Sequence, residues 1–250
     1  MTATQDARRV TARHRLVLVL AANSGVTDAL GVLALGGAFT SVMTGNMVLA
    51  GVGAATGDTD LTLLAAAAIL CFALGCALGA RLAGTPQQGD PVWPRPICRA
   101  LVVQLVLTAV FAVGWWATGG DPGDLVELGF LMVNALGLGI QSSAVQRLGQ
   151  SGLSTTYLTG TLTTIAVRVA TGHRLGTVSA SLQILLALVA GAALGGALTA
   201  FVPQAAPVPQ LCCLAAAVVG GLVLSRPATG SPARRRDPSE PAEVAGKLNP

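Results

Sequence analysis

The fold of this chain is decided by the stretch TGNMVLAGVGAATG at residues 44–57, in which Thr44-Gly45 is followed by Ala55-Thr56-Gly57. The same pattern returns, at a constant offset of 115 residues, as Thr159-Gly160 followed by Ala170-Thr171-Gly172. Two matches at one spacing indicate a duplicated unit about half the chain long. In membrane proteins, duplicated halves commonly frame a central binding or permeation site.

The composition places the chain in a lipid bilayer. Hydrophobic residues make up 52% of it and charged residues only 10%, against about 25% charged residues in a soluble domain. Apolar runs near the ~20 residues needed to cross a bilayer recur along the chain, so we predict an all-α polytopic membrane protein. These runs are approximately residues 16–36, 38–56, 61–83, 98–118, 125–147, 155–171, 176–201 and 208–225.

The charged loops decide which of the eight runs cross the membrane. If all eight crossed from a cytoplasmic N-terminus, the loop with Arg81, Arg95 and Arg99 would lie outside, against the positive-inside rule. If the runs at 38–56 and 155–171 instead enter and return on one face, every charged loop agrees with the rule. We therefore predict six transmembrane helices plus two broken or re-entrant Thr-Gly segments. Both termini are then cytoplasmic.

Each half then has three crossings, which makes the second half inverted relative to the first. The halves, 16–118 and 124–225, form a single membrane domain. A basic cytoplasmic tail at 1–15 precedes it, and a disordered cytoplasmic tail at 226–250, rich in Arg, Pro and Glu, follows it. The third and seventh runs also match, with small-residue faces suited to close helix contact: Gly75-Cys76-Ala77-Leu78-Gly79 and Gly191-Ala192-Ala193-Leu194-Gly195.

Two motifs resemble a known family. Asp28-Ala29 followed by FTSVMTGN at residues 39–46 is similar to a signature of the YoaK-like bacterial inner-membrane family of unknown function. The stretch GIQSSA at 139–144, followed by TTYLTGT at 155–161, is similar to its second signature, although Ser142 stands where the family typically has Asn. The resemblance covers roughly residues 16–225. It implies a multi-pass inner-membrane protein and supplies no established activity.

Two of the charged residues within apolar runs are candidates for function, Asp28 and Arg168. Asp28 is the most unusual, because an ionisable group inside a membrane helix is costly and is a functional hypothesis by default. It can bind a cation or proton, pair with an arginine, or cap the backbone of a broken segment. Arg168 can hold an anionic solute, or it can extend to the cytoplasmic interface as another positive-inside charge.

The Thr-Gly segments supply most of the other candidates. Glycine lets the backbone unwind, and the freed amides and carbonyls can bind ions or polar solutes. The competing interpretation is tight helix packing, with Thr bonded to its own helix. The candidate binding residues are Asp28, Thr44, Gly45, Asn46, Gln141, Thr159, Gly160, Thr161 and Arg168, and Asn23 and Asn134 could line the same interior.

These features favour a secondary transporter or channel-like permease for a small polar or ionic solute. The alternative is a non-transporting scaffold or partner-binding subunit whose polar residues lock helices together. An intramembrane enzyme is a third and weaker alternative, because the sequence has no nucleophile–base–orienter set, and we expect no enzymatic activity. His14, His173 and the five cysteines lack metal-site spacing, so we expect no metal and no cofactor. The expected partners are the lipid bilayer, the solute and a second copy in a homo-oligomer, and we expect no nucleic acid.

Overall fold

The computed structural model describes residues 3–87, 90–148, 158–172 and 179–225. Within these ranges the regular structure is helical and contains no strand. Six helices are long and apolar enough to cross a membrane, which confirms the predicted all-α polytopic fold. They are α1 (Ala3–Ala34), α3 (Thr59–Ala83), α4 (Arg95–Ala117), α5 (Asp124–Gln146), α7 (Ser179–Phe201) and α8 (Val208–Leu224). The last span includes the short 3-10 helix η2 (Pro203–Ala205) that precedes α8.

The first helix is longer than the sequence predicts. The first apolar run begins at residue 16, yet α1 begins at Ala3 and carries the basic residues of the predicted tail. A helix does not stop where hydrophobicity stops, because its backbone hydrogen bonds continue in water when the residues are good helix formers. The predicted tail at 226–250 lies outside the described residues.

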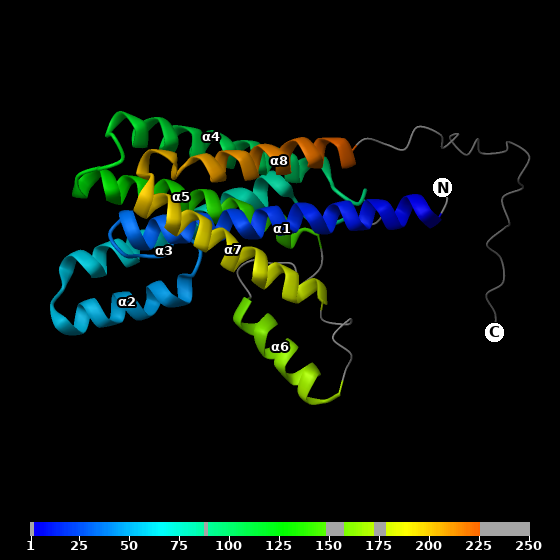
Figure 1. The fold of residues 1–250 in the computed structure, drawn as a ribbon, viewed down its shortest axis with the longest axis horizontal. Helices are drawn as coiled ribbons and strands as arrows, with labels where there is room; N and C mark the ends of the chain where they lie inside the picture. Colours follow the sequence, from blue (N-terminus) through cyan, green and yellow to red (C-terminus); the bar gives the residue numbers. More distant parts are fainter. Residues whose placement is uncertain (1–2, 88–89, 149–157, 173–178, 226–250) are drawn as a thin grey trace, which may run out of the picture.

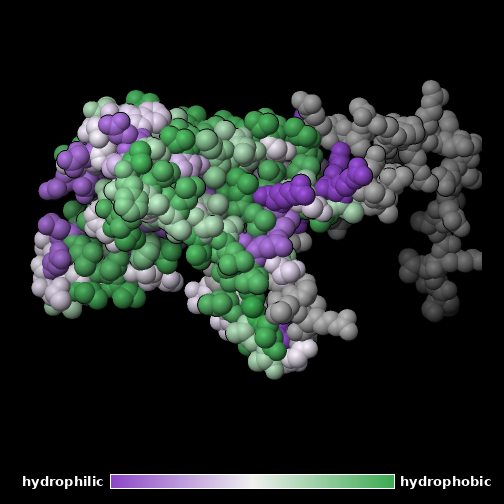
Figure 2. Space-filling view, in the orientation of Figure 1, coloured by the Kyte–Doolittle hydropathy of each residue, from purple (hydrophilic) through white to green (hydrophobic). Residues whose placement is uncertain are grey.

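The six long helices form a bundle whose two ends carry opposite charge. Figure 1 shows that α1 begins and α8 ends at the same end of the bundle. Arg81 and Arg95, at the end of α3 and the start of α4, belong to that end. At the other end, Asp58 is the N-cap of α3 and Asp124 is the first residue of α5. Figure 2 shows hydrophilic residues at the two ends of this face and hydrophobic residues over most of its length between them. This separation of arginines from aspartates is the one that the positive-inside rule predicts for six crossings.

Two short helices lie beside the bundle. They are α2 (Met43–Thr56) and α6 (Leu158–Ala170), with 14 and 13 residues. At 1.5 Å per residue each is about 20 Å long, which is less than the ~30 Å hydrocarbon thickness. Figure 1 shows both on the same side of the long helices, and α2 packs on α3 while α6 packs on α7. That these segments re-enter the membrane stays a prediction.

Two close helix crossings hold the bundle together, α3 against α5 and α1 against α7. A Cβ atom at Gly139 of α5 would overlap the carbonyl oxygen of Phe72 in α3. In the other crossing, a Cβ atom at Gly25 of α1 would overlap the carbonyl oxygen of Leu188 in α7. The small-residue faces predicted on α3 and α7 lie at the same two crossings. The two crossings thus resemble one another in their glycine-to-backbone contacts, and the inverted repeat itself stays a prediction.

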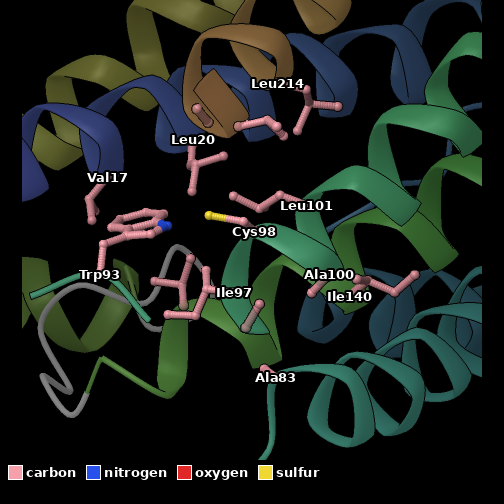
Figure 3. Close-up of a cluster of buried hydrophobic side chains, with 14 of the residues drawn as sticks. Val17, Leu20, Ala83, Trp93, Ile97, Cys98, Ala100, Leu101, Ile140 and Leu214 are labelled. Carbon is pink, nitrogen blue, oxygen red and sulfur yellow. The ribbon is translucent and has the colours of Figure 1, made fainter. Parts of the chain in front are cut away.

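Two hydrophobic clusters fill the bundle, one toward each end. Figure 3 shows part of the cluster at the arginine end, where the Trp93 ring lies beside Val17 of α1 and points toward Cys98 of α4. Leu20 of α1 and Leu101 of α4 close the same cluster. The other cluster contains Leu30, Phe111, Trp115 and Leu131 among others. The space between the two clusters is occupied by polar side chains.

Candidate functional site

A buried polar cluster lies in the middle of the bundle, where α1, α4, α5 and α8 meet. We call it the amide cluster, because five of its seven side chains are amides. None of them is more than 5% exposed. Its members are Asn23, Ser24, Thr27, Gln104, Asn134, Gln141 and Gln210.

Gln141 of α5 is the centre of the amide cluster. Its Nε2 donates to the carbonyl oxygen of Leu20 at 3.1 Å and to the hydroxyl of Ser24 at 3.0 Å. Its Oε1 accepts from Nδ2 of Asn23 at 3.0 Å and from Nε2 of Gln104 at 3.1 Å. Because a backbone carbonyl can only accept, the Leu20 contact fixes which end of the Gln141 amide is nitrogen. Asn23 and Gln104 must then present their own nitrogens to Gln141.

Gln210 of α8 forms the second part of the cluster. Its Nε2 donates to the Thr27 hydroxyl at 3.0 Å and, at a long 3.5 Å, to Oδ1 of Asn134. The Thr27 hydroxyl already donates to the backbone of Asn23, and the Asn134 amide nitrogen donates to the backbone of Phe130. Both groups can therefore only accept from Gln210, which fixes the orientation of its amide as well.

Three amide oxygens of this cluster have no protein donor among the described residues. They are Oδ1 of Asn23, Oε1 of Gln104 and Oε1 of Gln210. Exchanging the oxygen and nitrogen of each amide would not pair these oxygens, because the nitrogens already donate to Gln141 or Thr27. An unpaired buried acceptor costs about 1–3 kcal/mol. Three of them in one buried cluster make an uncharged site that is ready to accept hydrogen bonds.

The amide cluster lies between the two hydrophobic clusters. Along α1, Leu20 belongs to the first hydrophobic cluster and Leu30 to the second, with Asn23 and Thr27 between them. Along α4 the same order recurs, because Gln104 lies between Leu101 and Phe111. A polar layer with an apolar layer on either side is the arrangement of a site near the middle of the membrane.

Asp28 is adjacent to the amide cluster in sequence but its carboxylate is turned to the link between α1 and α2. Oδ1 accepts from the backbone and hydroxyl of Thr40 at 2.8 and 2.9 Å and from the backbone of Ser41 at 2.7 Å. Oδ2 accepts from the Ser41 hydroxyl at 2.6 Å. These four contacts are those of a cap, which is one of the roles that the sequence leaves open. A role in ion coupling stays a prediction.

Asn46 closes the same link from the other side. Its Oδ1 accepts from the backbone N–H of Phe39 at 2.9 Å, and its Nδ2 donates to the Phe39 carbonyl at 2.7 Å. A Cβ atom at Gly45 would lie 3.1 Å from the Phe39 ring, so a larger residue there would require the ring to shift. Thr44 is exposed. The first family-like motif therefore builds the turn into α2.

The structure places the two Thr-Gly pairs on separate short helices beside the bundle, and a binding site between them stays a prediction. Among the described residues, the neighbours of a Cβ at Gly45 belong to Phe39 and Val42, and a Cβ at Gly160 would have none within 4 Å. Thr159, Gly160 and Arg168 are exposed, while Thr161 is buried. The short helix α2 packs on α3, and α6 packs on α7, so both Thr-Gly pairs lie outside the bundle core. Residues 155–157 of the second family-like motif lie outside the described residues.

Of the sequence candidates, the structure brings Gln141, Asn23 and Asn134 into one cluster. Sequence reasoning missed Gln104 and Gln210, which provide two of the three unpaired oxygens. A signal for both exists, since each is the single amide of a mainly apolar helix. A neutral polar residue at such a position needs a partner inside the protein or a ligand.

Comparison with known proteins gives a family but no activity. A curated relative, UPF0700 transmembrane protein YoaK of Bacillus subtilis (strain 168), is 29% identical over 153 residues. The match spans 61% of this chain and 65% of that relative, which is less than two thirds of its length. No solved structure matches the chain. The family model described as Protein of unknown function (DUF1275) matches residues 16–220, and the chain belongs to that family.

Proposed function

We propose that the protein is a secondary transporter or channel-like permease, and that the amide cluster binds its solute. The observation that supports this most is the set of three unpaired oxygens, on Asn23, Gln104 and Gln210, in the core of a membrane bundle. A purely structural cluster would be expected to pair its buried acceptors, because each unpaired one is costly. A bound solute would supply the donors.

The chemistry of the cluster defines the class of solute. Its members are neutral amides and hydroxyls, and its free groups are acceptors. The Asp28 carboxylate is not a member of the cluster, and both of its oxygens accept hydrogen bonds from Thr40 and Ser41. The site therefore suits a small neutral solute with several N–H or O–H donors, or a monovalent cation held by carbonyl-type oxygens. An anion would meet three repelling oxygens.

The layered core supports movement of a solute through the bundle. Access from one side requires the cluster around Leu20 and Leu101 to open, and access from the other requires the cluster around Phe111 and Trp115 to open. In transporters built from repeats, such openings alternate about a central site. By the positive-inside rule, the arginine end and both termini face the cytoplasm of a bacterial inner membrane.

Uptake into proteoliposomes tests the proposal. The purified chain is reconstituted and screened with labelled small amides, polyols and monovalent cations, alongside the Gln104→Leu variant. Gln104→Leu removes one free acceptor at nearly constant volume, and we expect uptake of the accepted solute to fall about tenfold or more. Gln183→Leu is the matched control, because Gln183 is exposed on α7 and bonds only to His14 among the described residues.

The competing scaffold role makes the opposite prediction. A scaffold would carry no solute faster than empty liposomes, and Gln104→Leu would then change nothing in the assay. Equal uptake by the parent and Gln104→Leu would also exclude the amide cluster as the solute site.

A further inference from the structure

A second feature lies at the arginine end of the bundle, apart from the amide cluster. A hollow of about 620 Å³ opens there between the end of α3, the start of α4 and the end of α5. Four arginines line it: Arg81, Arg95, Arg99 and Arg147. Among the described residues that line it, Asp90 is the one acidic group, which leaves an excess of three positive charges. The hollow therefore attracts an anion.

Arg147, which lines this hollow, has a buried donor without an acceptor among the described residues. Its side chain is only 7% exposed, and its NH2 group donates to Oδ2 of Asp90 at 3.0 Å. Its Nε–H, however, is buried without an acceptor among the described residues. The backbone N–H of Gln87 and the Arg147 guanidinium hold the pKa of Asp90 below its usual value. Asp90 is thus a charged partner for one side of Arg147, and the Nε–H on the other side is a donor that a further anionic oxygen would satisfy.

An apolar groove adjoins the charged hollow. It has a volume of about 600 Å³, shares Arg95 and Arg99 with the hollow, and continues along α4 and α8 past Val102 and Leu222. Val102 is 42% exposed and Leu222 is 48% exposed on the outer surface of the bundle. In a bilayer this surface faces the acyl chains of lipids. The charged hollow and the apolar groove thus share Arg95 and Arg99.

We propose that the two hollows together bind an anionic phospholipid, with its phosphate among the four arginines and one acyl chain in the groove between α4 and α8. Arginine forks match the oxygens of a phosphate, and basic pockets between transmembrane helices on the cytoplasmic side suit anionic headgroups. The positive-inside rule explains arginines at this end. It does not explain a buried Arg147 with a free Nε–H, nor an apolar groove that runs out from Arg95 and Arg99.

Native mass spectrometry of the full-length chain in detergent tests this site. The protein is titrated with phosphatidylglycerol and with phosphatidylcholine of the same chain length. We expect tighter binding of phosphatidylglycerol, and a loss of about tenfold or more in that affinity in the double variant Arg95→Gln/Arg99→Gln. Both arginines are exposed, so the variant should keep its fold. Arg15→Gln is the matched control, an exposed arginine of α1 outside both hollows, and it should bind like the parent.

Two further arms separate a lipid from a free phosphate. Glycerol phosphate, the headgroup without chains, should bind far more weakly than the lipid. Val102→Phe, which fills the groove, should weaken lipid binding and leave glycerol phosphate unaffected. The proposal is overturned if glycerol phosphate binds as tightly as phosphatidylglycerol, if phosphatidylcholine binds equally, or if Arg15→Gln loses as much affinity as the double variant.

Discussion

Asp28→Ala should lower the free energy of unfolding by about 3 kcal/mol or more. The carboxylate of Asp28 accepts four hydrogen bonds from Thr40 and Ser41, and alanine would leave two buried backbone N–H groups without an acceptor. The link into α2 would lose its attachment to α1. The change is measured by heating the protein in detergent and then determining, by size-exclusion chromatography, the fraction that stays monodisperse.

Asp28→Asn is the matched control for this prediction. An amide oxygen can keep the three contacts that Oδ1 makes, and its nitrogen can face the Ser41 hydroxyl, so we expect a loss of only about 1 kcal/mol. A stable Asp28→Asn variant also tests the ion-coupling role. If it folds but no longer drives solute uptake with an ion gradient, Asp28 couples ions as well as capping the link. If Asp28→Ala melts like the parent, the capping role is wrong.

Gly25→Ala and Gly139→Ala should each destabilise the bundle by about 3 kcal/mol. The added methyl group would overlap a backbone carbonyl of the facing helix, that of Leu188 in one crossing and that of Phe72 in the other. A backbone atom cannot turn away as a side chain can, so the two helices must separate. The effects should be similar, because both glycines face a backbone carbonyl of the neighbouring helix at almost the same distance.

Gly51→Ala supplies the control for both crossings. Gly51 lies within α2, and a Cβ atom there would have no neighbour within 4 Å. Alanine should be neutral or stabilise α2 by up to about 1 kcal/mol, from helix propensity alone. Thermal melting of the three variants under one condition compares them. A neutral result at Gly139 together with a large loss at Gly25 would argue against equivalent roles for the two halves.

The fold class and the six crossings were predictable because they follow from apolar runs and loop charge. The end-to-end separation of Arg81 and Arg95 from Asp58 and Asp124 is a property of where charges fall between runs, so it needs no tertiary information. The start of α1 at Ala3 was not predictable in this way. Hydrophobicity marks the bilayer boundary, and a helix can extend beyond it.

The site was predicted only in part. Gln141 was named because of its motif, whereas Gln104 and Gln210 carry no motif and lie on helices distant in sequence. Their importance comes from which helices meet, and single-sequence patterns contain no such information. The motif containing Asn46 predicts a binding segment, but the structure uses that amide to fold the link at Phe39. A polar side chain in a membrane protein can have all its hydrogen bonds with nearby backbone groups. Only the folded structure shows which side chains are engaged in this way.

The most direct test of the amide cluster as a solute site is the melting temperature of Gln104→Leu without added solute. Gln104 makes one hydrogen bond, to Gln141, and leaves its own oxygen unpaired, so leucine removes a costly acceptor along with one contact. Gln141 keeps its bond from Asn23. We predict that Gln104→Leu melts at or above the temperature of the parent while its uptake falls. A melting temperature lower by about 5 °C or more would show that the cluster serves to hold the helices together, and would contradict the account.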